Sequence, residues 1–272
     1  MNNTLSWVKS MENPGGGLSA WMDGYKAPSY PEVTGYIIPT LYDYGEKGLA
    51  GRCADWLCKI QHKEGWWGGI HVDTPQTFDT AAILEGLTRA HQETGKDEYL
   101  DACIKANDWL LSLRDEETGT LPTEPGKPTQ LYTARAAWIL GDYHGLDHWL
   151  PKSGWDDRWG DKQRPHYIAY LLEGLYNLGY DITPVLEAAK HIEGLFPFYA
   201  GKGWKVIEGT DTSAIIQMAI LYKKNGMSID HLLPAIELMV TPSGGLRHSY
   251  LETRMTLWTA KYYLDLLKLL EE

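Results

Sequence analysis

The chain has 272 residues, of which 43% are hydrophobic and 22% charged, so it can bury a large core and is not expected to be disordered. Asp and Glu outnumber Lys and Arg by 36 to 25, and the formal charge of −11 disfavours nucleic acid and anionic membranes as partners. No apolar run is long enough to span a bilayer and the N-terminal residues lack the pattern of a signal peptide, so we expect a cytoplasmic protein.

The aromatic composition is skewed, with 12 Trp and 17 Tyr against 3 Phe. Trp and Tyr combine a flat apolar face with a polar edge, which suits a binding surface better than a purely packed core. The three cysteines, Cys53, Cys58 and Cys103, are odd in number and lie in segments that are predicted to be helical. They are therefore interpreted as buried small side chains. We expect no disulfide framework, no metal and no cofactor.

A glycine-containing loop recurs six times along the chain. The anchor glycines are 51, 51, 41, 43 and 42 residues apart, and they are Gly17, Gly68, Gly119, Gly160, Gly203 and Gly245. Six copies of a unit of this length are typical of helical hairpin repeats.

The expected elements alternate between amphipathic helices and helices that are apolar on almost every side. After a short amphipathic segment at 3–12, the predicted inner and outer helices follow in turn: 31–44 and 47–62, 75–92 and 97–114, 131–144 and 142–150, 165–179 and 182–195, 211–225 and 229–240, and finally 250–269. A helix that is apolar all round is a buried helix. The pattern predicts an all-α (α/α)6 toroid as a single domain over 1–272, in which the N-terminal segment partners the last inner helix.

Two sequences have the spacing of a helix capping box, Ser29 to Glu32 and Ser249 to Glu252. They predict that inner helices begin at these positions. Pro165 fits the first position of the inner helix expected at 165–179, where the missing N–H costs nothing.

The six loops and the starts of the inner helices carry many polar-aromatic and charged side chains. Because sugars offer flat C–H faces and hydroxyl rims, these side chains predict a saccharide site at one end of the ring. The alternative is that the Trp residues only pack the loops together. The candidate substrate-binding residues are Trp21, Tyr30, Trp66, Trp67, His71, Tyr132, Arg135, Arg164, His166, Trp204, Arg247 and Arg254.

Two segments resemble known toroids. WLCKIQHKEGWW, residues 56–67, resembles the QW repeat of squalene cyclases and related prenyltransferase-like toroids, with Gln61, Gly65 and Trp67 at its marked positions. That resemblance implies a structural role, in which the repeat ties outer helices to loops. SYPEVTGYIIPTLYDYG, residues 29–45, resembles the helical domain of D-glucuronyl epimerases and related toroids. It implies glycan chemistry at Tyr30, Glu32, Thr34 and Tyr36.

One reading of the chemistry is glycoside hydrolysis by two carboxyl groups. Asp79 and Asp211 occupy equivalent places in TFDTAAI and GTDTSAI, at the starts of the second and fifth inner helices, which we expect to face each other. Glu32 is a third candidate. Acids at these positions also complement the helix dipole, so each has a purely structural alternative.

The other reading is uronate lyase or epimerase chemistry, in which a cation neutralises the substrate carboxylate while Tyr or His moves a proton. Arg135, Arg164 and Arg254 would supply the cation, unless they pair with acids such as Asp79, Asp211 or Glu252. The candidate proton-transfer groups include Tyr36 and His248.

The sequence thus predicts a carbohydrate-active enzyme that acts on a poly- or oligosaccharide, as a glycoside hydrolase or as a polysaccharide lyase or epimerase. A non-catalytic toroid that binds glycan or protein is the alternative from another class. An isoprenoid cyclase is a weaker alternative, because the chain contains neither a DxDD nor a DDxxD motif.

Overall fold

A computed structural model describes residues 3–141, 143–151, 154–192 and 196–272. The chain divides into two compact units, a first unit of Lys9–Gly145 and a second unit of Met1–Val8 with Leu146–Glu272. Helices α1 (Asn3–Ser10) and α8 (Tyr143–Asp147) contain the two division points. That residues 1–272 act as one domain stays a prediction.

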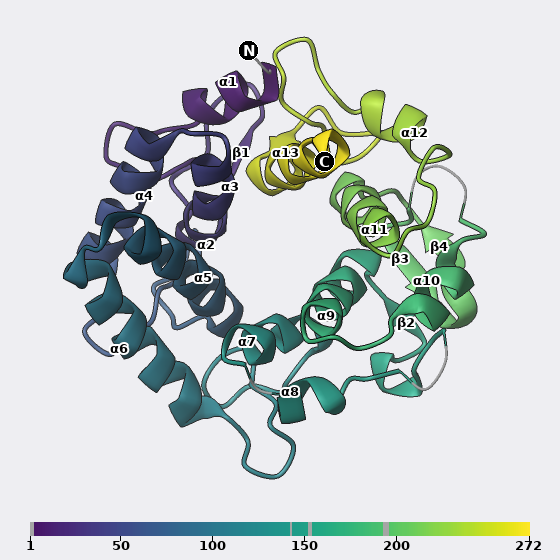
Figure 1. The fold of residues 1–272 in the computed structure, drawn as a ribbon, viewed down its shortest axis with the longest axis horizontal. Coiled ribbons are helices and arrows are strands. Elements are labelled where there is room, and N and C mark those ends of the chain that lie inside the picture. Colours follow the sequence, from purple (N-terminus) through teal and green to yellow (C-terminus); the bar gives the residue numbers. More distant parts are fainter. Residues whose placement is uncertain (1–2, 142, 152–153, 193–195) are drawn as a thin grey trace. The chain divides into compact units, whose positions relative to one another are not determined.

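In the first unit, α2 (Pro31–Tyr36), α3 (Ile38–Asp43), α5 (Thr77–Thr94) and α7 (Ala134–Ile139) form one row of helices. The longer amphipathic helices α4 (Lys47–Ile60) and α6 (Asp97–Leu113) pack against that row, as Figure 1 shows in purple to teal. The short strand β1 (Trp21–Met22) lies in the loop before α2.

Helices α2 and α5 meet at backbone distance. A Cβ atom added at Gly35 would lie 2.6 Å from the Cα atom of Ile83, and one added at Gly86 would collide with the carbonyl oxygen of Gly35. Only glycine leaves room for so close an approach. The contact fixes the last turn of α2 against the middle of α5.

In the second unit, α11 (Thr212–Lys224) is the central helix, with α9 (Pro165–Asn177) and α13 (Leu257–Glu271) beside it. The short helices α10 (Thr183–Ala189) and α12 (Leu233–Glu237) also contact α11, as Figure 1 shows in green. Every residue from Thr212 to Ala219 is buried, which explains why this stretch is rich in small and aliphatic side chains.

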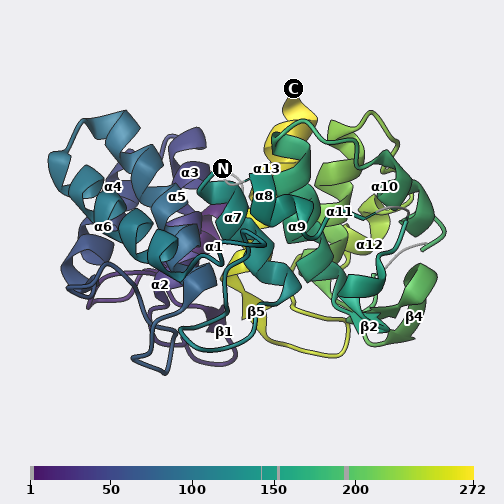
Figure 2. The ribbon, with the colours of Figure 1, turned by 90° about the horizontal axis from the view of Figure 1, so that it is seen from below.

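Short strands precede the inner helices of this unit. Strands β2 (Lys162–Gln163), β3 (Tyr199–Gly201) and β4 (Lys205–Glu208) form an antiparallel sheet in which Lys162 pairs with Gly201 and Tyr199 with Glu208. Figure 2 shows β2 and β4 at one end of the helices of this unit. Strand β5 (Met255–Thr256) directly precedes α13.

Most of the expected inner helices are present with small shifts at their ends, but two are wrong in extent. The helix expected at 131–144 is a short 3-10 turn followed by α7, and it ends before Gly141, whose φ of 69° is left-handed. The helix expected at 250–269 begins only at Leu257. Residue 142 of the predicted 142–150 helix and residues 193–195 of the predicted 182–195 helix lie outside the described residues.

Neither predicted capping box starts a helix with its serine. The Ser29 hydroxyl instead donates to the Gly16 carbonyl oxygen at 2.6 Å, and Tyr30 is the residue before α2. Ser249 lies in a turn followed by extended chain, several residues before α13. Matching spacing is therefore not sufficient here, because tertiary contacts use the serine elsewhere.

Residues 3–8 of the N-terminal segment belong to the second unit, and their pairing with the last inner helix stays a prediction. The Trp7 indole lies so close to Gly245 that an added Cβ would be 2.7 Å from its Cε2 atom.

Among the described residues, no helix is both long enough and apolar enough to cross a membrane.

Candidate functional site

In the first unit, the first two glycine loops meet at the start of α5. The rings of Trp21 and His71 contact each other edge to face, with centroids 6.2 Å apart. The hydroxyl of Tyr30, the residue before α2, donates a hydrogen bond to the carboxyl group of Asp79 in the first turn of α5. We call Trp21, Tyr30, His71 and Asp79 the Asp79 cluster.

Asp79 is the most perturbed acid of this unit. Its side chain is only 6% exposed, and burial raises its pKa from 3.8 to about 7, against the opposing effect of the Tyr30 hydrogen bond. Its Oδ2 atom is buried without a hydrogen-bond partner among the described residues. A carboxyl group in this state holds its proton near neutral pH and can donate it.

Glu32 and Tyr36 lie on α2, where Gly35 contacts α5. Glu32 is 6% exposed and Tyr36 is 1% exposed, so both side chains are buried. Thr34, which shares the segment that resembles the epimerases, accepts a hydrogen bond from the backbone N–H of Leu18 and donates to the Tyr30 carbonyl oxygen. Thr34 therefore ties the first glycine loop to α2.

Three of the predicted binding Trp residues are buried. Trp66 stacks on His62 with centroids 4.1 Å apart, and the indole of Trp67 donates to the Leu57 carbonyl oxygen at 2.9 Å. Trp204 is fully buried in the second unit and donates to the Gly154 carbonyl oxygen at 2.9 Å. Protein atoms cover the faces of these three indoles. They therefore fit the alternative in which the Trp residues only pack the loops together.

Arg135 lies on α7 with 1% exposure and donates to Glu85 on α5 at 2.6 Å. Glu85 was not among the acids expected to pair with the arginines. The guanidinium also lies over the Trp138 ring, 5.3 Å from its centroid. Tyr132, also partly buried, packs edge to face on Phe78.

In the second unit, Asp211 joins helix capping to an ion pair. Its Oδ1 atom accepts from the backbone N–H groups of Ser213 at 2.9 Å and Ala214 at 3.3 Å, so it caps α11. Its Oδ2 atom lies 3.4 Å from Nη2 of Arg164. Asp211 is 1% exposed, so both the capping and the pairing alternatives for this residue hold.

Two buried histidines lie near this pair. His166, in the first turn of α9, has its pKa lowered to about 4, mainly by burial. Burial also lowers the pKa of His248, with Asp211 and Glu252 acting in the opposite direction. Both imidazoles are neutral at pH 7 and able to accept a proton. We call Arg164, His166, Asp211 and His248 the Asp211 cluster.

Phe198 connects the Asp211 cluster to an open pocket of about 590 Å³. The Arg164 guanidinium lies over the Phe198 ring, 4.2 Å from its centroid, and His248 meets that ring edge to face at 6.4 Å. The pocket is lined by Phe198, Gly209, Thr210, Ser249, Tyr250, Leu251 and Glu252. Tyr250 is 53% exposed and offers a polar-aromatic surface.

The remaining predicted arginines differ in environment. Arg254 pairs with Glu252 at 2.7 Å, as one alternative anticipated, and Arg247 is exposed in the sixth loop. Three contacting residues were not predicted from the sequence. Glu85 pairs with Arg135 in the first unit, and Phe198 and Gln217 contact the Asp211 cluster in the second unit. Only Gln217 carried a signal, because it is the single amide in the apolar stretch from Ala214 to Leu221.

Over residues 3–141, 143–151, 154–192 and 196–272, no three His, Cys, Asp or Glu side chains gather so that they could ligate a metal ion. Cys53, Cys58 and Cys103 are free thiols. Burial raises the pKa of Cys53 and of Cys58 to about 12, so both stay protonated at neutral pH.

Known proteins resemble this chain in structure but not in sequence. No family model matches the chain, and no curated protein matches its sequence. Solved structures do match over almost the whole chain. An alpha-amylase from Clostridium perfringens has a TM-score of 0.77 at 12% identity, with 99% of this chain and 98% of that chain covered.

Two further similar structures are those of enzymes named for sugar substrates. A cellobiose 2-epimerase from Spirochaeta thermophila has a TM-score of 0.73 at 13% identity, covering 98% of this chain and 94% of that chain. An unsaturated glucuronyl hydrolase specific for heparin has a TM-score of 0.68 at 15% identity, with the same coverage. The predicted fold is confirmed: the chain shares the all-α (α/α)6 toroid fold of these proteins.

Proposed function

We propose that this chain is a carbohydrate-active enzyme that acts on a poly- or oligosaccharide, and that it is a glycoside hydrolase. The observation that carries the proposal is Asp79, a buried carboxyl group with a pKa of about 7, an Oδ2 atom without a partner among the described residues, and the Trp21–His71 pair in the adjoining loops. The shared fold supports it, because the structurally similar proteins include an alpha-amylase, a glycosidase and an unsaturated glucuronyl hydrolase.

In this proposal Asp79 is the general acid. It donates its proton to the glycosidic oxygen as the bond to the anomeric carbon breaks, and water adds to that carbon. The Tyr30 hydroxyl, which already donates to Asp79, stabilises the carboxylate that forms. A second carboxylate takes the proton from water, and Glu32, which lies in the same unit as Asp79, is the candidate for that role.

Lyase or epimerase chemistry is the second candidate, and the Asp211 cluster favours it. Two neutral imidazoles beside a guanidinium could remove and return a proton next to a substrate carboxylate. Asp211 already offsets the charge of Arg164, and Glu252 that of Arg254, which weakens the attraction of these arginines for a uronate. Hydrolysis is therefore preferred.

The test is a screen of the purified chain against neutral and uronate-containing oligosaccharides, with products followed by mass spectrometry. New reducing ends without an unsaturated uronate chromophore indicate hydrolysis, whereas that chromophore indicates elimination. We expect Asp79→Asn to lower kcat by ~10²-fold or more, the contribution of a positioned acid. The matched control is Asp101→Asn, on the exposed face of α6.

Saccharide binding by calorimetry without any product would instead favour the non-catalytic toroid. A product from an isoprenoid diphosphate would refute the carbohydrate assignment. We also propose a cytoplasmic location. Nucleic acid and anionic membranes are not expected as partners, because the formal charge of −11 disfavours both.

A further inference from the structure

Gln217 is a polar residue in an apolar environment. It lies in the second turn of α11, among Ile215, Ile216 and Met218, and is 3% exposed. Its Oε1 atom lies 2.5 Å from Nδ1 of His166 on α9. Burying a primary amide costs free energy unless both its carbonyl oxygen and its NH₂ group form hydrogen bonds.

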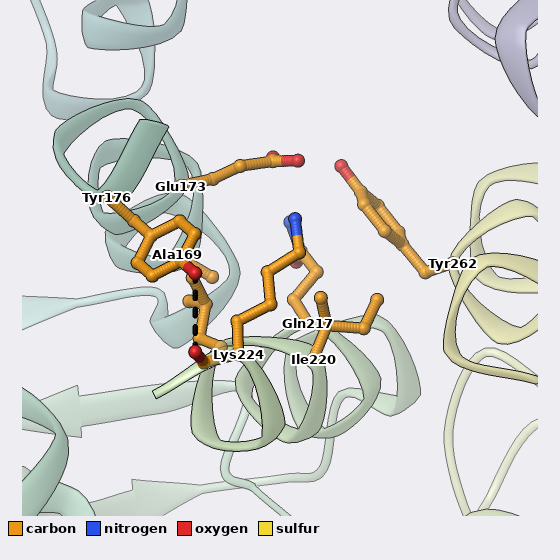
Figure 3. Close-up of a pocket in the computed structure, with 8 residues that line it drawn as sticks. Ala169, Glu173, Tyr176, Gln217, Ile220, Lys224 and Tyr262 are labelled. Atoms are coloured by element: carbon orange, nitrogen blue, oxygen red, sulfur yellow. Dashed lines mark hydrogen bonds between the residues drawn. The ribbon is translucent and has the colours of Figure 1, made fainter. Parts of the chain in front are cut away.

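The other end of the amide faces a small pocket between α9, α11 and α13. Figure 3 shows Gln217 and Lys224 reaching from α11 toward the Glu173 carboxylate, with the Tyr262 hydroxyl opposite that carboxylate. The Nε2 atom of Gln217 has no hydrogen-bond partner among the described residues. The pocket has a volume of about 10 Å³, which is about the space that one water molecule needs.

In the structure the amide turns its oxygen toward His166 and its NH₂ group toward this pocket. The carboxylate of Glu173 accepts hydrogen bonds but does not donate them, so this side of the pocket suits the amide NH₂ group, directly or through a water. The amide carbonyl then faces His166. Because a carbonyl oxygen only accepts, Nδ1 of His166 must carry the proton that this short contact shares.

A neutral imidazole has a single N–H, so a proton on Nδ1 leaves Nε2 with a free lone pair. The charged and titratable groups around His166 are Arg164 two residues earlier, Asp211 at the start of α11, His248, and the tyrosines Tyr167 and Tyr170, whose ring centroids lie 5.9 and 4.5 Å away. Burial outweighs the attraction of Asp211 and keeps the imidazole neutral.

We propose that Gln217 is a positioning residue that holds His166 in its Nδ1–H tautomer, so that Nε2 can accept a proton from substrate or water. The proposal rests on the second candidate function, because it assigns a proton acceptor to the Asp211 cluster. In the step, a proton next to the substrate carboxylate moves to Nε2 while the electron pair of the broken bond stays on the substrate, giving an imidazolium that still donates from Nδ1 to Gln217. The proton leaves again from Nε2 when the product forms.

The primary experiment needs no substrate. Protein labelled with ¹⁵N at histidine would be studied by long-range ¹⁵N–¹H correlation, with His166→Asn used to assign the resonances. We expect Nδ1 of His166 to be protonated, Nε2 to be unprotonated, and the ring to stay neutral down to about pH 5. Nε2–H in the wild-type protein, or a charged ring at pH 7, would overturn the proposal.

Two variants separate positioning from packing. Gln217→Met keeps the length of the side chain but removes the acceptor, and we expect the Nδ1–H tautomer to lose its dominance. Gln217→Glu keeps an acceptor, so the tautomer should persist while the pKa of His166 rises. An unchanged tautomer in Gln217→Met would refute the role of Gln217. Gln92→Met, at an exposed position of α5, is the matched control.

With a substrate in hand, Gln217→Met should lower kcat by ~10²-fold with little change in KM, and Gln217→Glu should recover part of that loss while moving the pH profile. If the oligosaccharide screen fails, the proposed function fails, but the tautomer measurement still decides the role of Gln217. A normal tautomer pattern with unaltered kcat would remove His166 from the reaction.

Discussion

Asp79 allows a prediction about stability that does not depend on any substrate. Burial raises its pKa from 3.8 to about 7, so the native state keeps a proton that the unfolded chain releases in this interval. The unfolded state therefore binds fewer protons, and stability falls as pH rises from about 4 to about 7. Roughly three pKa units at 1.36 kcal/mol each give about 4 kcal/mol in total.

Asn at position 79 is uncharged at every pH, so Asp79→Asn should remove this loss. We expect the variant to have a similar free energy of unfolding to wild type near pH 4 and to be more stable by up to about 4 kcal/mol at pH 8. Urea unfolding at both pH values, followed by circular dichroism, measures the difference. Asp101→Asn, on the exposed face of α6, should show a constant difference. A gap for Asp79→Asn that stays constant within 1 kcal/mol would mean that Asp79 is already ionised, and would also remove it as a general acid.

Two other substitutions test the packing that holds the site. Arg164→Met leaves its buried acidic partner uncompensated and should cost about 3 kcal/mol in urea unfolding, whereas Lys202→Met breaks only an exposed pair and should leave the unfolding midpoint unchanged. Equal costs would mean that the Arg164 pair is solvated. Gly35→Ala should lower stability by about 2 kcal/mol or more, because its Cβ would lie 2.6 Å from the Cα atom of Ile83. Gly48→Ala, on the open side of α4, should raise the melting temperature instead, since its Cβ would meet only the Arg52 guanidinium at 3.7 Å.

The repeat and the apolar helices were predictable because both are properties of the local sequence. The helix expected at 165–179 is observed at Pro165–Asn177, and the one expected at 211–225 at Thr212–Lys224. The start of the last helix was not predictable, because Ser249 and Glu252 have the spacing of a capping box but the chain there forms a turn that leads into β5. Spacing records what a residue can do, whereas the contacts that it makes depend on distant parts of the fold.

The candidate site was predictable in its residue types and less so in its partners. Asp79 and Asp211 were singled out from equivalent places in the repeat, and both are buried at helix starts. The buried Trp residues illustrate the limit, since composition cannot distinguish an indole that packs a loop from one that faces a ligand. Gln217 illustrates another, because its importance appears only when His166, 51 residues away, is placed beside it.

The backbone contact between α2 and α5 has a consequence for the kinetics of ligand capture. Gly35 lies three residues after Glu32 and Ile83 lies four residues after Asp79, so Glu32 and Asp79 stand about one helical turn from an interface that two glycines, Gly35 and Gly86, bring to backbone contact. Such an interface has no rotamers to rearrange. We expect the spacing of these groups to be the same in the empty and the occupied protein, and association to follow a single concentration-dependent phase without a slow isomerisation step.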